Sequence, residues 1–151
     1  MESQRVKDIL PAVLGNIQSY KNSTDKKTKH AIRYGLRRLI QYATEAEPKL
    51  ISQSALSICQ SKGLDWTKLT RNVPSGIKGK PAVLGDHAEP LMELVWSIYG
   101  AQEAQIEQIL IDYPPICWIT REEDDTLNRG GFKNKRPGGW KKIYDQCGIV
   151  L

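Results

Sequence analysis

The chain has 151 residues, 40% of them hydrophobic, which is enough to bury the core of one ordinary domain. Its apolar runs are too short to span a membrane and no charged start precedes an apolar signal core, so we expect a soluble, cytoplasmic protein with no membrane partner. Its three cysteines lack Cys-x-x-Cys spacing, which argues against a disulfide framework and a thiolate zinc site.

The net charge of +5 is unevenly distributed along the chain. Residues 1–85 hold 15 Lys and Arg against 6 Asp and Glu, whereas residues 86–151 hold 7 against 11. A basic first half favours a polyanionic partner, and the acidic block in residues 86–125 is what a divalent cation needs nearby. A charged surface that serves only solubility explains the same counts.

The first half of the chain is predicted to be mainly helical. Apolar residues at helical spacing indicate a helix over residues 3–20. A second helix is expected to begin after a capping residue at 23, 24 or 25 and to run to about residue 46, because Pro48 disfavours helical geometry before it. A third helix is expected over residues 50–61, followed by loops and turns.

The second predicted helix carries a basic flank beside its apolar stripe. At about 100° per residue, five side chains share this flank: Lys26, Lys29, His30, Arg33 and Arg37. Such a row can follow phosphates by charge alone, with salt-sensitive and sequence-independent affinity. We therefore predict nucleic-acid binding by Lys26, Lys29, Arg33 and Arg37, although lysine-rich helix faces are often only solvated.

The second half is predicted to combine short strands with helices. Strands are expected near residues 82–84, 116–119 and 149–151, joined in one small sheet, with a turn at Gly85. A helix is expected to have Glu89 and Pro90 in its first turn and to end before Gly100, and another is expected over residues 101–111. Thr120 with Glu123 has the spacing of a capping box for a third. The acidic run REEDD therefore has two explanations: acidic residues at the N-terminus of a helix, or a metal-binding site.

These elements predict an α+β fold, mainly helical in the N-terminal half, with a small sheet in the C-terminal half. We expect a single domain over residues 1–151, with a basic helical part in 1–80 and an α+β part in 81–151. In the tail, two pairs of glycines frame a basic run. Its bases Lys133, Lys135 and Arg136 are predicted to reach phosphates, the alternative being a mobile surface loop.

The stretch GDHAEPL, residues 85–91, joins a predicted strand to a predicted helix. It resembles the first motif of the HNH, or ββα-metal, endonucleases, which begins with a DHxxPL-type sequence. Asp86, His87, Pro90 and Leu91 stand in the corresponding places. The family motif continues to an asparagine and a final histidine or asparagine, and the available positions here are Asn128 and Asn134, beyond a helical insertion.

The resemblance implies a role for each of these residues. His87 would activate the attacking water, and Asp86 would help to hold a divalent cation, usually Mg²⁺, against the scissile phosphate. This chemistry is sound because an imidazole titrates near neutral pH and the metal offsets charge on the phosphate. Asn128 and Asn134 would complete the catalytic motif.

Three functions therefore follow from the sequence. The first is nucleic-acid binding with metal-dependent phosphodiester hydrolysis, on DNA in preference to RNA. The second is binding without catalysis, in which His87 hydrogen-bonds Asp86 or a backbone carbonyl. The third is a protein-interaction module whose oppositely charged halves meet in a dimer. Nothing resembles a P-loop, a dinucleotide fingerprint or a nucleophile elbow.

Overall fold

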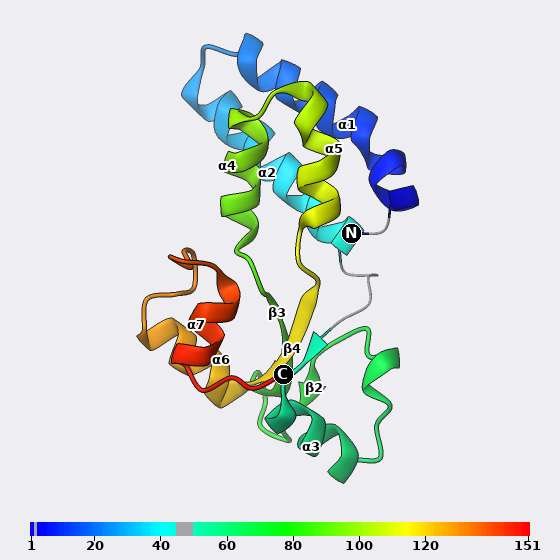
Figure 1. Cartoon of the computed structure of the whole chain (residues 1–151), viewed down its shortest axis with the longest axis vertical. Helices are drawn as coiled ribbons and strands as arrows, with labels where there is room; N and C mark the ends of the chain where they lie inside the picture. The colour runs from blue at the N-terminus through cyan, green and yellow to red at the C-terminus, as the bar shows by residue number, and fades with distance from the viewer. Residues whose placement is uncertain (2, 45–49) are drawn as a thin grey trace. The chain divides into compact units, whose positions relative to one another are not determined.

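A computed structural model describes residues 1, 3–44 and 50–151, and the chain forms two compact units (Figure 1). Unit 1 comprises residues 1–47 and 91–114, and unit 2 comprises residues 48–90 and 115–151. The units do not follow the expected division at residue 80. The reason is that the helical segment 91–112 packs with the first two helices of the chain, so unit 2 is assembled from two separate stretches of sequence.

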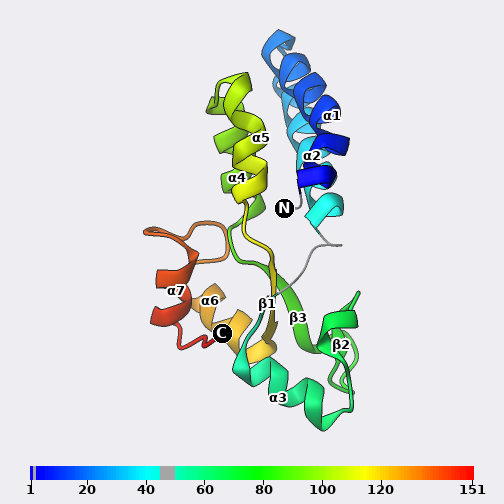
Figure 2. The ribbon, with the colours of Figure 1, turned by 45° about the vertical axis from the view of Figure 1, so that its right-hand side comes forward.

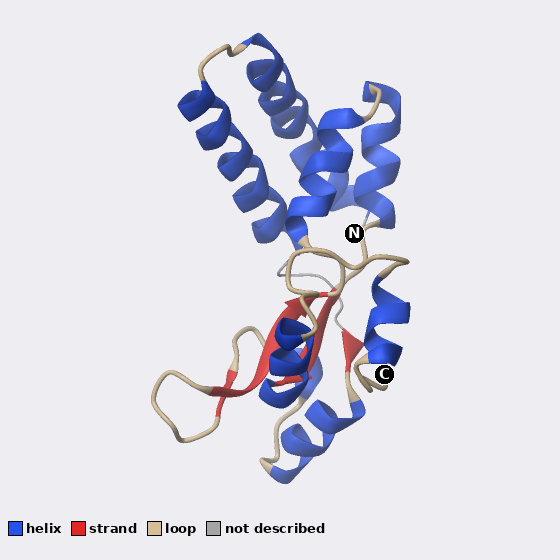
Figure 3. Cartoon of the chain, turned by 90° about the vertical axis from the view of Figure 1, so that its left-hand side faces the viewer, coloured by secondary structure: helices blue, strands red, loops and turns tan. Residues whose placement is uncertain are grey.

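Unit 1 is wholly helical in its described residues and consists of two helical hairpins (Figure 3). Apolar residues from all four helices form one core, in which Val13, Leu36, Ile98 and Leu110 are fully buried. Burying each such side chain stabilises the fold by roughly 1.5–3 kcal/mol. The helices are α1 (Ser3–Asn22), α2 (Lys26–Thr44), α4 (Leu91–Gly100) and α5 (Glu103–Asp112).

The start of α2 shows which of the expected capping residues acts. The side chain of Asp25 accepts a hydrogen bond from the backbone N–H of Thr28 at 2.6 Å, so Asp25 satisfies a free donor of the first turn. The predicted end near residue 46 lies outside the described residues. Helix α1 continues through Pro11 to Asn22, slightly beyond its predicted end.

Unit 2 is built on a four-stranded sheet with the order β1-β4-β3-β2. Strand β1 pairs with β4 in parallel, and the other neighbours are antiparallel. Helices α6 and α7 pack on one face of the sheet and α3 on the other (Figure 2). The elements are β1 (Leu50–Ile51), α3 (Gln53–Ser61), η1 (Trp66–Lys68), β2 (Val73–Pro74), β3 (Pro81–His87), β4 (Ile116–Thr120), α6 (Arg121–Arg129) and α7 (Trp140–Gln146).

Strand β4 is buried along its whole length, and alternate residues face the two sides of the sheet. Cys117 and Ile119 pack with α6 and α7, whereas Trp118 packs with α3. In β3, Leu84 and Asp86 pair with Ile119 and Cys117. Asp86 therefore belongs to the face that α6 and α7 cover.

The α+β class is confirmed, but three local predictions are wrong. Residues 149–151 form no strand; instead the carbonyl of Val150 accepts a hydrogen bond from the N–H of Gln53 at 2.8 Å. Residues 50–51 belong to β1 rather than to a helix, because Ser52 caps α3 through the N–H of Ala55. Gly85 continues β3 instead of turning.

The predicted strand at 116–119 and the capping box at Thr120 are confirmed. Thr120 Oγ accepts from the N–H of Glu123, whose carboxylate accepts from the N–H of Thr120 in return. Among the described residues, no helix is long and apolar enough to cross a lipid bilayer.

Candidate functional site

The aspartate of the GDHAEPL stretch lies at the end of β3, where a buried arginine holds its carboxylate. Arg136 Nη2 donates to Asp86 Oδ1 at 2.9 Å and to Oδ2 at 2.8 Å. Tyr144 of α7 donates its hydroxyl proton to the same Oδ2 at 2.5 Å. Both oxygens of the carboxylate therefore accept hydrogen bonds from within unit 2.

Arg136 also donates hydrogen bonds to backbone carbonyls at the end of β3 and in the loop before α7. Its Nη1 donates to the carbonyls of His87, at 2.9 Å, and of Ala88, and its Nε lies 3.4 Å from the carbonyl of Phe132. The side chain of Arg136 is only 2% exposed. Although the sequence predicted this arginine to reach phosphates, its guanidinium instead fastens the loop 130–139 to the end of β3.

Burial governs the titration of this cluster. Desolvation raises the pKa of the Asp86 carboxyl, while the charge of Arg136 and the hydrogen bond from Tyr144 act in the opposite direction. Desolvation, together with the neighbouring carboxylate, raises the pKa of Tyr144 far above its usual value. The Tyr144 phenol therefore keeps its proton and remains a donor at neutral pH.

The other residues of the predicted catalytic site are only partly brought together. His87 follows Asp86 on β3 and so points to the opposite face of the sheet. Asn128 lies on α6 and donates to Asp124 Oδ2 at 3.1 Å, whereas Asn134 is exposed in the loop before α7. The order β3, β4, α6 is a ββα arrangement, interrupted by the α4–α5 hairpin.

The predicted divalent cation does not fit this cluster. Within the part of the chain that the structure describes, no three His, Cys, Asp or Glu side chains are grouped to hold a metal ion. The Arg136 guanidinium already neutralises the Asp86 carboxylate, which is the ligand assigned to Mg²⁺. The acidic residue Glu123 is likewise occupied, because its Oε2 accepts from Ser52 Oγ and from the N–H of Thr120, both at 2.7 Å.

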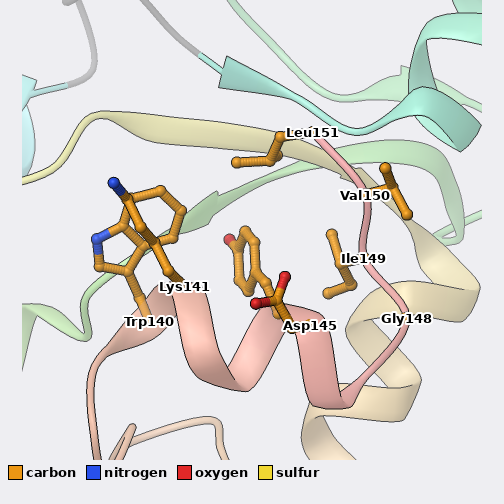
Figure 4. Close-up of a pocket in the computed structure, with 8 residues that line it drawn as sticks. Trp140, Lys141, Asp145, Gly148, Ile149, Val150 and Leu151 are labelled. Atoms are coloured by element: carbon orange, nitrogen blue, oxygen red, sulfur yellow. The ribbon is translucent and has the colours of Figure 1, made fainter.

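Unit 2 also contains a cavity of about 460 Å³ between α7 and the segment that follows it (Figure 4). Its walls are largely apolar, from Trp140, Ile149 and Leu151, with Lys141 and Asp145 as the charged groups. Lys141 Nζ lies 5.6 Å from the centre of the Trp140 ring. The volume falls within the usual range of small-molecule pockets, about 300–1,000 Å³.

The basic flank of α2 in unit 1 has a partner that the sequence did not reveal. Lys29 Nζ lies 5.0 Å from the centre of the Tyr20 ring of α1, and Arg33 Cζ lies 4.7 Å from the centre of the Trp96 ring of α4. Tyr20 and Tyr99 are stacked, with ring centres 4.2 Å apart. We call these five residues the basic-aromatic surface: Tyr20, Lys29, Arg33, Trp96 and Tyr99.

Hydrogen bonds fix the centre of the basic-aromatic surface to the helices below it. The Tyr99 hydroxyl donates to Asn16 Oδ1 at 2.7 Å, and Asn16 Nδ2 donates to the carbonyl of Ile32 at 3.0 Å. Asn16 thus links α1, α2 and α4. Burial raises the pKa of Tyr99 to about 12, so that its hydroxyl remains neutral at physiological pH.

Two of the other predicted binding residues of α2 continue this surface along the helix. Lys26 precedes Lys29 by one turn and is exposed, and Arg37 follows Arg33 by one turn and is half-buried. In the tail, Lys133 and Lys135 are exposed on the loop that Arg136 fastens. Of the seven predicted phosphate contacts, four therefore share one helix and three lie in the other unit, where Arg136 is buried.

Tyr20, Trp96 and Tyr99 were not predicted, because they belong to α1 and α4 and reach the basic flank of α2 only through the packing of these helices. One pattern could have revealed Trp96. The buried residues of α4 are Leu91, Leu94, Val95 and Ile98, and Trp96 falls outside that apolar stripe. A tryptophan on the exposed side of an amphipathic helix is a candidate for binding.

Comparison with protein-family models, curated proteins and solved structures finds no match to this chain.

The division of charged residues between the two units differs from their division between the two halves of the sequence. Unit 1 holds nine bases and nine acids, whereas unit 2 holds 13 bases and 8 acids. Unit 1 therefore carries no net charge, and all nine of its bases lie in residues 5–38.

Proposed function

We propose that this chain binds nucleic acid through the basic-aromatic surface of unit 1, without cleaving it. The observation that carries the proposal is the seating of Lys29 and Arg33 over the rings of Tyr20 and Trp96, on a surface contributed by three helices. Cations held beside aromatic rings are the combination that nucleic-acid-binding grooves use for phosphates and bases. Packing alone does not require two cations at this place.

The spacing of the bases supports contact with several phosphates. Lys26, Lys29, Arg33 and Arg37 follow one side of α2 over 11 intervals, which is about 16 Å of helix axis. Each neutralised phosphate of a single strand contributes roughly −0.7 to the slope of log affinity against log salt. Four contacts therefore predict a slope of about −3.

The cluster around Asp86 argues against metal-dependent hydrolysis at this site. A metal ligand needs free carboxylate oxygens, but Arg136 and Tyr144 occupy both oxygens of Asp86. Replacing a guanidinium by a hydrated cation would leave Arg136 buried and unpaired, which is strongly unfavourable. The ion pair explains Asp86 as a structural residue of unit 2.

The test is fluorescence anisotropy with labelled oligonucleotides of about 20 nucleotides, from about 50 to 200 mM salt. Arg33→Glu/Arg37→Glu should weaken binding at least about tenfold and reduce the salt slope by about two contacts. Lys7→Glu/Arg38→Glu is the matched control, since it removes the same charge from exposed positions of α1 and α2.

Two outcomes would reject the proposal. One is unchanged affinity in Arg33→Glu/Arg37→Glu, provided that its far-ultraviolet circular dichroism shows a folded protein. The other is an equal loss in the control pair, which would indicate a response to net charge. A third variant, Lys133→Glu/Lys135→Glu, tests the basic tail of unit 2 in the same assay.

A further inference from the structure

We propose that the basic-aromatic surface selects single-stranded nucleic acid, with a base stacked on Trp96 as the selective contact. This inference rests on the proposed function and specifies its substrate class. Trp96 is 48% exposed although it is the largest type of apolar side chain, and its ring already lies against Arg33. An exposed indole beside a guanidinium presents both a stacking plane and a phosphate contact in one place.

The three rings form a preorganised platform. The centres of Trp96 and Tyr99 are 6.4 Å apart with planes inclined by 60°, and Tyr99 stacks on Tyr20 at 4.2 Å. Because Tyr99 is hydrogen-bonded to Asn16, the platform is fixed to the helical core. A base that stacks on Trp96 therefore meets a ring whose neighbours are already in position, which limits the entropy lost on binding.

Single strands fit this surface better than duplexes for a geometric reason. In a duplex both faces of each base are covered by the neighbouring base pairs, so only phosphates and groove edges remain for the protein. An unpaired base offers its face, and stacking on an aromatic ring tolerates every base. Phosphate contacts by α2 serve either form, whereas Trp96 serves only the unpaired one.

The charge of the surface favours a nucleic acid over a protein partner. Tryptophan and arginine are common in both kinds of interface, but lysine is depleted from the centre of protein interfaces. Here Lys29 lies within the platform over Tyr20, and Lys26 adjoins it one turn away. A polyanion is the partner that this combination of charges complements.

The experiment compares oligo-dT and oligo-rU of about 20 nucleotides with a duplex of equal length. The whole chain should bind the single strands more tightly than the duplex. Trp96→Ala should weaken single-strand binding by about 5- to 150-fold, the range for one lost stacking contact, and change duplex binding by about twofold or less. Trp96→Phe should retain most of the single-strand affinity.

Tyr42→Ala is the matched control, because Tyr42 is an 80% exposed aromatic residue on the opposite side of α2 from Arg33. It should leave all affinities unchanged. A second readout is tryptophan fluorescence: single strands should quench it in the parent, and Trp96→Phe should abolish most of that quenching. Quenching that persists in Trp96→Phe would contradict the stacking contact.

The outcomes separate the two proposals. If Arg33→Glu/Arg37→Glu weakens binding but the parent prefers duplex, or Trp96→Ala weakens both forms equally, single-strand selection is wrong and nucleic-acid binding stands. If neither Trp96→Ala nor the charge reversal changes any affinity, both proposals are wrong. If Trp96→Ala is unfolded, the quenching in Trp96→Phe tests single-strand selection instead: its loss supports the stacking contact and its persistence contradicts it.

Discussion

Arg136 hydrogen-bonds both carboxylate oxygens of Asp86 through a single guanidinium nitrogen, Nη2, at 2.9 Å and 2.8 Å. Its second terminal nitrogen bonds the carbonyls of the two residues that follow Asp86. One side chain therefore fixes both the end of β3 and the loop 130–139. Since Arg136 and Asp86 are only 2% and 16% exposed, breaking the pair would leave a charge in the interior of unit 2.

The first prediction follows from this burial. Arg136→Met should lower the free energy of unfolding by about 3–5 kcal/mol, because removing one partner leaves Asp86 charged and unpaired. Arg121→Met is the control: its ion pair with Asp125, at 3.1 Å, joins side chains that are 42% and 45% exposed. That pair should contribute about 1 kcal/mol or less.

Urea denaturation measures both variants. The double variant Asp86→Asn/Arg136→Met should be less destabilised than the sum of the two single variants, by at least about 1 kcal/mol, since each single change leaves the other member of the pair unsatisfied. Strict additivity, or an equal loss in Arg121→Met, would show that Asp86 and Arg136 do not depend on each other.

The second prediction concerns the close approach of Trp118 to Gly85. A Cβ at Gly85 would lie 3.1 Å from Ile116 Cγ2 and 3.3 Å from a ring carbon of Trp118. Gly85→Ala should therefore destabilise the protein by about 1–3 kcal/mol, the usual effect of overpacking. Gly15→Ala is the matched control, because a Cβ in α1 at Gly15 has no atom within 4 Å.

Gly15→Ala should raise stability by up to about 1 kcal/mol, since alanine is the better helix former. Thermal melting of the two variants should therefore shift in opposite directions. Equal shifts would mean that the Trp118 ring is not packed across Gly85. The same contact explains why a glycine stands within β3, where pairing with Trp118 of β4 replaces the turn that its residue type suggested.

The third prediction is a loss of stability at alkaline pH. Burial raises the pKa of the Cys117 thiol to about 12 and that of the Tyr144 phenol beyond it. From about pH 9 upward, the unfolded chain releases these protons while the folded chain keeps them. Unfolding then becomes more favourable as pH rises, so the melting temperature should fall between about pH 9 and pH 12.

Tyr144→Phe provides the comparison for this pH dependence. The variant should be less stable than the parent at neutral pH, by about 1–3 kcal/mol, because Asp86 loses a hydrogen bond. Its melting temperature should fall less steeply above about pH 10, because one of the two retained protons is gone. Identical slopes would show that Tyr144 titrates normally in the folded protein.

How far the sequence predicts this fold can be judged from particular elements. Strand β4 and the capping box at Thr120 were predictable because burial and hydrogen bonding of those residues are local patterns. Strands β1 and β2 were not, since each has two residues and exists only through pairing with β4 or β3. The carbonyl of Val150 likewise accepts a hydrogen bond from the start of α3 rather than from a strand, and this contact depends on the tertiary structure.

The candidate site likewise has residues that local patterns predict and residues that only the tertiary structure brings together. The bases of α2 were found because helical periodicity places them on one flank, but their aromatic neighbours come from α1 and α4, and only folding brings them together. Asp86 was assigned to a metal ion, whereas Arg136 and Tyr144 occupy its carboxylate in the structure. Its partner Arg136 was assigned to phosphates, because sequence alone does not show that an arginine between glycine pairs is buried.

The last prediction concerns His87, the residue that the resemblance makes the general base. Purified protein incubated with plasmid DNA, single-stranded DNA and RNA should show no cleavage with Mg²⁺ or Mn²⁺ beyond that with EDTA. The reason is that Asp86, the assigned metal ligand, is neutralised by Arg136. His87→Ala should leave nucleic-acid affinity unchanged, because His87 belongs to unit 2 and the basic-aromatic surface to unit 1.

The same substitution should act on stability instead. His87 is half-buried where β3 ends, opposite Ile116 of β4, so its loss should reduce the free energy of unfolding by about 1–3 kcal/mol. Metal-dependent cleavage by the parent that His87→Ala lowers by about 10² to 10⁴, with folding and affinity intact, would establish His87 as a general base. That result would require Asp86 to exchange Arg136 for a metal ion, and it would replace binding without cleavage by hydrolysis as the function of this chain.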